Sequence, residues 1–355
     1  MPGLRASLAL VLSAAIACTT PGGSRATPTG ALPSPSVLPQ QTTTARATLI
    51  PTARATPTPT PTPTPVPKDP VLADTPVQSG LRIPWDLAFA PDGRMFVTER
   101  AGNVLIFESG ATNAPRIGHF SVPAIRQLGE SGLMGIALDP DFARNGLLYV
   151  CASRTDEGEF RNQVLRLRAT GNEIALEGYV IRTGMRAAAA HDGCTVRVGP
   201  DHKLWVSMGD ATSRQLAQDP RSLNGKVLRV NTDGSVPADN PTLPGASAPS
   251  LVYSWGHRNV QGITFQPGTG IPFASEHGQD THDEINVLEP GANYGWPLAE
   301  GPDPQRRFRD PAWTSGNVTI ATSGATFVSG QNWGTWSGSL FVAQLKESDL
   351  RGSPC

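Results

Sequence analysis

The amino-acid sequence predicts an all-β fold built as a propeller. From about residue 70 onward no long segment shows helical periodicity, and short runs rich in Val, Ile, Leu, Phe and Trp alternate with clusters of Gly, Pro, Asn and Asp. In this part a tight turn that leads into an apolar strand recurs roughly every 50 to 70 residues. That period suits four-stranded blades arranged radially, each packed on its neighbours. A sandwich of two sheets, the alternative, would explain the strands but not the recurring unit.

The recurring unit has five copies, so about five blades are visible. Two of them read A-P-D-G-R-M-F-V-T-E and G-P-D-H-K-L-W-V-S-M, with Pro, Asp and Gly as the turn residues. The last copy, W-S-G-S-L-F-V-A-Q-L, keeps the turn and the strand without the Pro-Asp pair. The copies begin at Ala90, Asp139, Gly199, Gln266 and Trp336.

Residues 1–18 have the features of an export signal. Arg5 precedes a run of apolar residues that is too short to span a bilayer as a mature helix. The run ends in A-A-I-A-C, which resembles a bacterial lipoprotein signal with Cys18 as the acylated residue. A plain secretory signal cleaved nearby is the alternative. Both predict a protein outside the cytoplasm, either anchored to the membrane through Cys18 or secreted or periplasmic.

Residues 19–70 form a predicted linker between the signal and a globular domain over residues 71–355. The segment is rich in Thr, Pro, Ala, Ser and Gly and ends in T-P-T-P-T-P-T-P-V-P. It cannot bury enough apolar surface to offset its ordering entropy, so we expect a disordered, extended spacer. The net charge of -1 and the pI near 6.6 point to neither nucleic acid nor an anionic surface as a partner.

The four cysteines, Cys18, Cys151, Cys194 and Cys355, have no C-x-x-C pair among them. A zinc site is therefore not expected. Cys151 and Cys194 lie in predicted strands, where they could be buried small hydrophobic residues or form a disulfide. The sequence leaves these two alternatives open.

Functional sites of propellers commonly lie at one end of the central channel, where loops of successive blades meet. His191 stands just ahead of a predicted strand, and an imidazole is well suited to take up a proton near neutral pH. Each candidate also has an ordinary interpretation: a histidine satisfied in a loop, an arginine paired with a loop carboxylate such as Glu276, or a lysine at an exposed strand end. The candidates are Glu130, His191, Arg258, Asn259, the loop 275–286 and Lys346.

The loop 275–286 places four carboxylates, Glu276, Asp280, Asp283 and Glu284, close together in the sequence. Like charges at this density favour a bound cation, and calcium is preferred because its ligands would be oxygens. Solvated loop acids are the alternative. The nearby histidines lack the paired spacing of a zinc site.

Five motifs, in the same order, closely resemble the soluble glucose and aldose sugar dehydrogenases that use pyrroloquinoline quinone (PQQ). The resemblance covers about Leu81 to Lys346 and implies a six-bladed propeller with PQQ over the channel mouth and calcium polarising the quinone. The motifs are G-E-S-G-L-M-G-I-A-L-D-P-D-F-A-R-N-G-L-L-Y-V, H-D-G-C-T-V-R-V-G-P-D, L-N-G-K-V-L-R-V-N-T-D-G-S-V-P-A-D-N-P, G-H-R-N-V-Q-G-I-T-F and D-E-I-N-V-L-E-P-G-A-N-Y-G-W-P.

The same resemblance assigns roles to individual residues. His191 would be the base that removes the proton of the sugar C1 hydroxyl as hydride passes to the quinone. Glu130 stands where the family usually has glutamine, and it joins the residues expected at PQQ, which are Glu130, Arg258, Asn259 and Lys346. The calcium ligands implied are the backbone carbonyls of Gly278 and Gln279, with Asp283 as a supporting acid.

The sequence departs from the family pattern in two places. After the histidine, Cys194 and Thr195 occupy positions where the family typically has Gly-Arg. The family also continues past the lysine strand into a sixth blade whose arginines reach the cofactor. Since only five turn-strand units are visible, we expect the last blade to be missing or incomplete and cofactor binding to be weakened.

The predicted function is an exported quinoprotein that oxidises the C1 hydroxyl of aldose sugars to lactones and passes the electrons to an external acceptor. One alternative is a surface propeller that binds sugar or protein without catalysis. Another is a calcium-dependent, lactonase-like hydrolase, which needs carboxylates and an asparagine as direct metal ligands in the channel. The motifs do not supply that set in a recognisable order.

Overall fold

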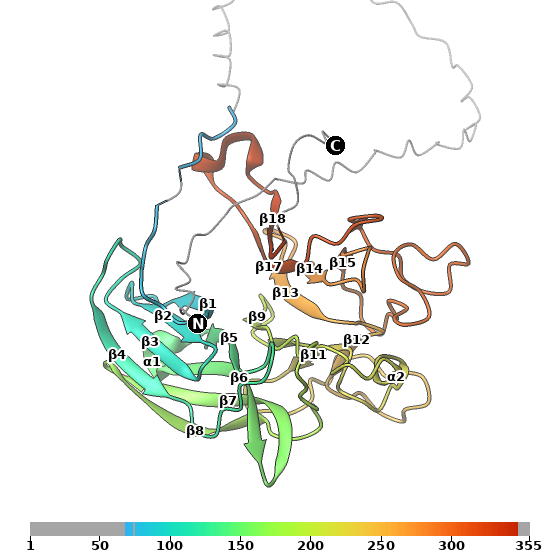
Figure 1. Ribbon diagram of the computed structural model, residues 1–355, viewed down its shortest axis with the longest axis horizontal. Coiled ribbons are helices and arrows are strands. Elements are labelled where there is room, and N and C mark those ends of the chain that lie inside the picture. The colour runs from blue at the N-terminus through green and yellow to red at the C-terminus, as the bar shows by residue number, and fades with distance from the viewer. Residues whose placement is uncertain (1–67, 74, 347–355) are drawn as a thin grey trace, which may run out of the picture. The chain divides into compact units, whose positions relative to one another are not determined.

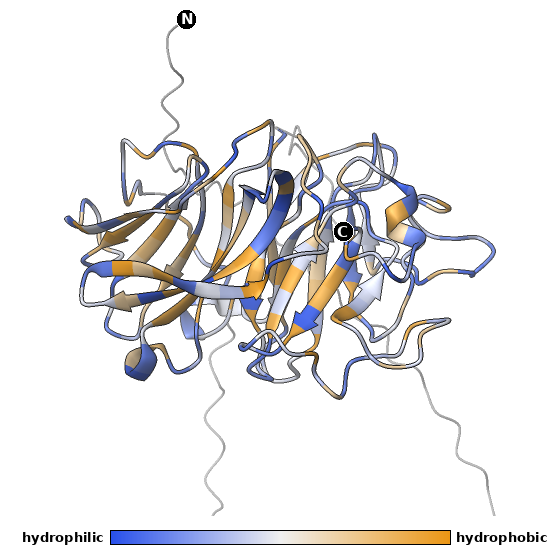
Figure 2. Cartoon of the chain, turned by 90° about the horizontal axis from the view of Figure 1, so that it is seen from below, coloured by the Kyte–Doolittle hydropathy of each residue, from blue (hydrophilic) through white to orange (hydrophobic). Residues whose placement is uncertain are grey.

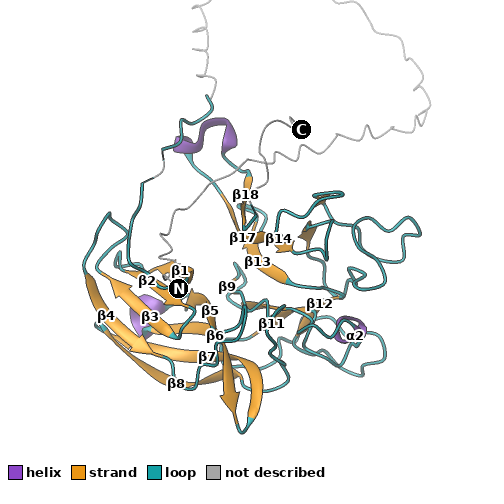
Figure 3. Ribbon diagram, in the orientation of Figure 1, coloured by secondary structure: helices purple, strands orange, loops and turns teal. Residues whose placement is uncertain are grey.

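The computed structural model describes residues 68–73 and 75–346, and these residues are nearly all β-structure and loops. Figure 1 shows the strands gathered into sheets that lie side by side, and Figure 3 shows how few helices accompany them. The predictions for the signal sequence, for acylation of Cys18 and for nearly all of the linker fall outside the described residues.

The described strands form four sheets of four strands and one sheet of two, and all pairing within the sheets is antiparallel. The first sheet contains β1 (Pro84–Phe89), β2 (Met95–Glu99), β3 (Asn103–Phe107) and β4 (Arg116–Ser121), and the second contains β5 (Leu133–Leu138), β6 (Leu147–Asp156), β7 (Glu159–Thr170) and β8 (Glu173–Ile181). The third contains β9 (Val196–Val198), β10 (Leu204–Met208), β11 (Lys226–Val230) and β12 (Val252–Trp255), the fourth β13 (Val260–Phe265), β14 (Pro272–Glu276), β15 (Glu284–Val287) and β16 (Trp313–Thr314), and the fifth β17 (Thr322–Phe327) and β18 (Leu340–Gln344).

The first strands of the five sheets, β1, β5, β9, β13 and β17, contact one another in chain order. Each sheet therefore extends outward from this inner row as a blade (Figure 1). The all-β propeller prediction is confirmed, with four complete blades and two strands of a fifth in the described residues.

Each predicted turn-strand unit is the connection from the first to the second strand of a blade. A backbone hydrogen bond closes these turns, for example from Ala90 N to Arg94 O at 2.8 Å and from Gly199 N to Lys203 O at 2.9 Å. The apolar strand that follows each turn is buried in the first three blades. The repeat was visible in the sequence because turn and strand are both local signals.

The core lies between neighbouring blades, whose apolar faces pack on each other. Figure 2 shows the apolar stretches along the strands. One cluster joins the second and third blades through fully buried side chains that include Met134, Tyr149, Val196 and Leu204. Three short helices complete the fold, α1 (Phe142–Asn145), α2 (Gln215–Gln218) and the 3₁₀ helix η1 (Gln331–Trp336), and no helix in the described ranges is long and apolar enough to cross a membrane.

One ion pair ties the first strands of three blades together. Arg197 in β9 donates from Nη1 to Asp86 Oδ2 at 2.6 Å and from Nη2 to Asp86 Oδ1 at 3.2 Å. Asp86 belongs to β1, and its Oδ2 also accepts from the backbone N–H of Ile136 in β5 at 3.1 Å. This bidentate pair fixes the relative positions of the first three blades at their inner edge.

A disulfide joins Cys151 in β6 to Cys194 in the loop ahead of β9, with 5.4 Å between the Cα atoms. It settles the alternatives that the sequence left open and links the second blade to the third. Both cysteines are fully buried.

Removing this bridge in the double variant Cys151→Ala/Cys194→Ala is expected to lower the free energy of unfolding by about 4 kcal/mol, because the bridge closes a loop of 43 residues in the unfolded chain. Urea unfolding followed by tryptophan fluorescence measures the loss. Wild-type protein unfolded with excess reductant is the control and should show a similar loss. A loss under about 1 kcal/mol would contradict this account.

Candidate functional site

The loop between β8 and β9 presents His191 with its backbone in the left-handed region, at φ 62°. The backbone N–H donates to Glu130 Oε2 at 2.9 Å, and the carbonyl accepts from Ala211 N at 3.1 Å. Imidazole Nδ1 lies 2.8 Å from Asp210 Oδ1. Both the main chain and the ring of His191 are thus held in place, while 18 % of the side chain remains exposed.

Asp210, just past the end of β10, is the residue that orients this ring. It is fully buried, and its Oδ2 accepts from the indole Nε1 of Trp296 at 2.9 Å, while Oδ1 also accepts from Thr212 N at 2.8 Å. An ionised carboxylate only accepts hydrogen bonds, so the proton of a neutral His191 sits on Nδ1 and the Nε2 lone pair is available. The sequence analysis did not single out Asp210. The Gly-Asp pair that ends the strand after the histidine was the available signal.

Asn259 holds the other end of the His191 loop. Its Oδ1 accepts from Gly193 N at 3.1 Å and from Gln261 Nε2 at 3.3 Å. Gly193 has φ 60°, and a Cβ there would lie 2.9 Å from Gly209 N, so only glycine fits this approach. Asn259, predicted at the cofactor, also positions the proposed base.

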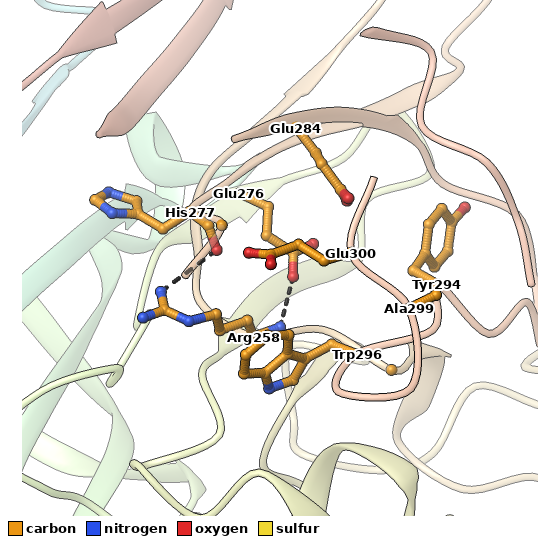
Figure 4. A pocket seen from close by; sticks show the side chains of 10 residues that line it. Arg258, Glu276, His277, Glu284, Tyr294, Trp296, Ala299 and Glu300 are labelled. Atoms are coloured by element: carbon orange, nitrogen blue, oxygen red, sulfur yellow. Dashed lines mark hydrogen bonds between the residues drawn. The ribbon is translucent and has the colours of Figure 1, made fainter. Parts of the chain in front are cut away.

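Arg258 is part-buried beside Trp296, with its guanidinium carbon 5.4 Å from the centroid of the indole (Figure 4). Its Nε is buried without a partner, and its Nη1 makes one long contact of 3.5 Å to the carbonyl of His277. Burial lowers the pKa of Arg258 from its usual value. Among the described residues no carboxylate forms an ion pair with this guanidinium, so it can take up an anionic group.

Glu276 was the candidate ion-pair partner of Arg258, but it bonds to other groups. Its Oε1 accepts from the backbone N–H of Arg258 at 2.5 Å, and its Oε2 lies 2.7 Å from His257 Nδ1. Asn286 Nδ2 bridges Glu276 Oε2 and Glu284 Oε2 at 3.1 and 3.0 Å. Burial, reinforced by the charge of Glu276, raises the pKa of Glu284 to about 8.

Arg258, Glu276 and Glu284 line a pocket that the connection between β12 and β13 forms with the fourth blade. Figure 4 shows Arg258 on one side and Glu276, Glu284 and Glu300 on the other. The pocket joins the arginine to the acidic loop that the sequence analysis marked as a cation site.

Gly278 and Asp283 shape the turn of that loop. Gly278 N donates to Asp283 Oδ1 at 2.9 Å, and a Cβ on Gly278 would lie 1.8 Å from the carbonyl oxygen of Thr281. The other oxygen of Asp283 accepts from Ile320 N at 2.6 Å and Ala321 N at 2.7 Å, which ties the loop to the fifth blade. The carboxylate of Asp283 is therefore engaged by protein donors.

Gln279 follows on the same turn. Its side chain is exposed, and its backbone N–H donates to Glu300 Oε1. In the described ranges no three His, Cys, Asp or Glu side chains converge as a metal-binding cluster. A cation at this turn would therefore rely on backbone carbonyls such as those of Gly278 and Gln279.

Lys346 lies just past the end of β18 in the fifth blade. It is exposed, and its backbone N–H donates to Ile320 O at 3.3 Å. Hydrogen bonds connect Glu130, His191 and Asn259 into one loop assembly, and Arg258 joins them through its carbonyl, which accepts from Asp210 N at 2.9 Å. No such contact in the described part of the chain links the side chain of Lys346 to this assembly.

Asp192, next to the proposed base, is a buried carboxyl that the sequence analysis did not mark. Its Oδ1 accepts from Asn162 Nδ2 and from Ala188 N, each at 3.0 Å, while Oδ2 is buried without a partner. Burial raises the pKa of Asp192 from 3.8 to about 6. Between about pH 4 and about pH 6 the folded protein therefore binds a proton at Asp192 that the unfolded chain has released.

Asp192 is expected to lower the free energy of unfolding by about 3 kcal/mol as the pH rises from about 4 to about 6, since a raised folded-state pKa stabilises the protein only at low pH. Glu284 adds a fall of its own that continues to about pH 8. Asp192→Asn should therefore remove about 3 kcal/mol of the fall and leave the part due to Glu284. Asp233→Asn, at an exposed turn, is the matched control and should keep the contribution of Asp192. Urea unfolding at a series of pH values measures the slope, and an unchanged slope in Asp192→Asn would show that another group is responsible.

Fold and site together define a β-propeller that carries a histidine-aspartate pair beside an arginine that has no carboxylate ion-pair partner within residues 68–73 and 75–346. The chain matches the Glucose / Sorbosone dehydrogenase family over residues 81–353 and belongs to that family. The resemblance inferred from the five motifs is thereby confirmed.

Individual relatives agree with this assignment. The chain is 35 % identical over 256 residues to quinoprotein glucose dehydrogenase B of Acinetobacter calcoaceticus, a match that covers 63 % of this chain and about half, 52 %, of that protein. It is 30 % identical over 295 residues to aldose sugar dehydrogenase YliI of Escherichia coli strain K12, covering 77 % of this chain and 78 % of that one. The PQQ-bound aldose sugar dehydrogenase of Streptomyces coelicolor has a similar structure, with 35 % identity, a TM-score of 0.65 and 76 % of each chain covered.

Proposed function

We propose that this protein is an exported quinoprotein that oxidises the C1 hydroxyl of aldose sugars to lactones, with His191 as the base. The observation that carries the proposal is the part-exposed imidazole whose Nδ1 is held by the buried carboxylate of Asp210. Such an arrangement leaves Nε2 free to take a hydroxyl proton. The family and the relatives support sugar oxidation as the reaction.

The residues present fit PQQ, a planar cofactor with carboxylates. The guanidinium of Arg258 lies beside an indole face, its Nε is buried without a partner, and no described carboxylate forms an ion pair with it. Glu130, Arg258, Asn259 and Lys346 are the residues that would hold the cofactor. When bound, PQQ supplies a two-electron oxidant that accepts hydride from the sugar carbon. An external acceptor would be needed to take up these electrons.

The turn at Gly278 fits calcium because its backbone carbonyls are oxygen ligands. Carbonyls are preferred calcium ligands, and Gly278 leaves no room for a side chain where the chain turns back. Gly278 and Gln279 would hold the ion, and Asp283 would fix the turn through its hydrogen bond to Gly278 N. Bound calcium supplies Lewis-acid polarisation of a carbonyl.

Residues of the chain itself accept the proton of the C1 hydroxyl and stabilise the charge that results. His191 Nε2 takes the proton of the C1 hydroxyl, and Asp210 stabilises the imidazolium that forms. Hydrogen bonds from Trp296 Nε1 and Thr212 N keep the Asp210 carboxylate aligned with the ring. Glu130 fixes the backbone of His191 through its N–H.

The proposed location of this activity is outside the cytoplasm, after export. The Cys151–Cys194 disulfide supports it, since structural disulfides persist in oxidising compartments. The signal-like residues 1–18 support it as well. Acylation of Cys18 would anchor the protein to the membrane, and without acylation the protein would be secreted or periplasmic.

The test is reconstitution of the purified full chain with PQQ and calcium, followed by dye reduction with a panel of neutral and anionic aldoses. A bound-quinone absorbance together with lactone formation is the expected result. The absence of both would refute the proposal for this chain. A lactone-hydrolysis assay on the same protein tests the hydrolase alternative, and activity there without dye reduction would favour it.

A further inference from the structure

Two arginines, Arg186 and Arg214, lie beside the His191 site and have no role in the function proposed so far. Arg186 precedes His191 in the loop between β8 and β9, and Arg214 directly precedes α2. Both side chains are exposed. No carboxylate in the described ranges forms an ion pair with either guanidinium, in contrast to Arg221, which pairs with Asp219.

Contacts connect both arginines to Asp210, the residue that orients the proposed base. Arg186 Nη1 donates to Ser213 Oγ at 3.1 Å, and Ser213 N donates to the carbonyl of Asp210 at 2.9 Å. The guanidinium carbon of Arg214 lies 5.2 Å from the centroid of the Trp296 indole, whose Nε1 donates to Asp210. Both arginines are therefore linked to Asp210, Arg186 through Ser213 and Arg214 through Trp296.

The position of Arg186 is fixed rather than incidental. The buried amide of Asn224 accepts from Arg186 N at 2.9 Å and donates to Arg186 O at 2.9 Å. The same Nδ2 donates to the carbonyl of Gly209 at 3.0 Å, next to Asp210. The main chain of Arg186 is thus tied to the strand end that carries the aspartate.

The negative groups nearby do not neutralise these arginines. Asp210 is buried, and its oxygens bond to His191, Trp296 and Thr212. Glu130 bonds to the backbone of His191. The guanidiniums of the two arginines remain as exposed donors, and their planar geometry suits a carboxylate or a phosphate.

We propose that Arg186 and Arg214 form an anion-binding rim that selects sugars carrying a carboxylate or a phosphate away from C1. The proposal rests on oxidation at C1 by the His191 site and names the substrate class of that site. A neutral aldose contacts the same base, but both guanidiniums remain hydrated. Each charge-assisted contact is expected to favour the anionic sugar by roughly 10- to 100-fold in kcat/KM.

The experiment uses the full chain reconstituted with PQQ and calcium. It compares kcat/KM for galacturonate with that for galactose, and for glucose 6-phosphate with that for glucose. At least one anionic sugar should exceed its neutral partner by about tenfold or more, and the pair that does so identifies carboxylate or phosphate as the group bound. Arg186→Gln and Arg214→Gln should each lower that ratio about tenfold or more, whereas Arg221→Gln, the matched control, should not.

Three results of these kinetic assays would overturn the rim. One is a wild-type ratio at or below one for both sugar pairs, and another is a ratio that neither variant changes. The third is a loss of PQQ affinity in the variants with the sugar ratio intact, which would assign the arginines to the cofactor. If no sugar reduces the dye, the proposed function fails. Calorimetric titration of galacturonate and glucose 6-phosphate into the wild type and into Arg186→Gln/Arg214→Gln then tests the rim by itself. Equal affinities of the two proteins for these sugars would refute the rim.

Discussion

Replacing His191 by asparagine is expected to lower kcat by roughly 10²- to 10⁴-fold while PQQ remains bound, because the variant has no group that can take the hydroxyl proton. Asparagine accepts the left-handed backbone that this position requires, at φ 62°. The fold should therefore survive. Dye-coupled turnover gives kcat, and absorbance of the bound quinone gives cofactor occupancy.

The same substitution at His202 is the matched control. His202 is also a histidine in the left-handed region, at φ 59°, but it is exposed in the turn between β9 and β10 and bonds only through its backbone in the described residues. His202→Asn should retain wild-type kcat. A kcat for His191→Asn within about threefold of wild type would remove His191 from the role of base.

Asp210→Asn is expected to lower kcat by roughly 10²- to 10⁴-fold with little change in KM. The amide can donate to His191 Nδ1, which moves the ring proton to Nε2 and blocks the lone pair that should accept the hydroxyl proton. The variant also loses the charge that stabilises the imidazolium. Steady-state kinetics with PQQ bound separate this effect on kcat from any effect on sugar affinity.

Asp201→Asn is the control for this variant. Asp201 Oδ1 also accepts from an indole Nε1, that of Trp205 at 3.2 Å, but it lies in the turn between β9 and β10. It should lose some stability and keep its kcat. Equal falls in kcat for the two variants would mean that Asp210 acts only through the fold.

Much of the fold could be predicted because its signals are local. The turns that begin at Ala90 and Gly199 and the apolar strands after them are contiguous in the chain, so turn chemistry and strand propensity mark them together. The closure of the turns by backbone hydrogen bonds follows from the same residues.

Contacts between residues far apart in the chain could not be predicted from the sequence. The bond from Trp296 to Asp210 joins residues 86 positions apart, and nothing in either local segment predicts it. The sequence placed Glu276 near Arg258 correctly, but only the structure shows that the carboxylate takes the backbone N–H and leaves the guanidinium without it. The assignment of PQQ and calcium residues came from family resemblance and stays a prediction.

Three different blades hold the single loop that carries His191. Glu130 comes from the loop that enters the second blade, Asp210 follows a strand of the third, and Asn259 leads into the fourth. Partial opening of any one of these interfaces would release one restraint before the protein unfolds as a whole. Turnover should therefore decline on heating at temperatures below the global unfolding transition. The rate of the enzyme would then report the loss of packing between neighbouring blades.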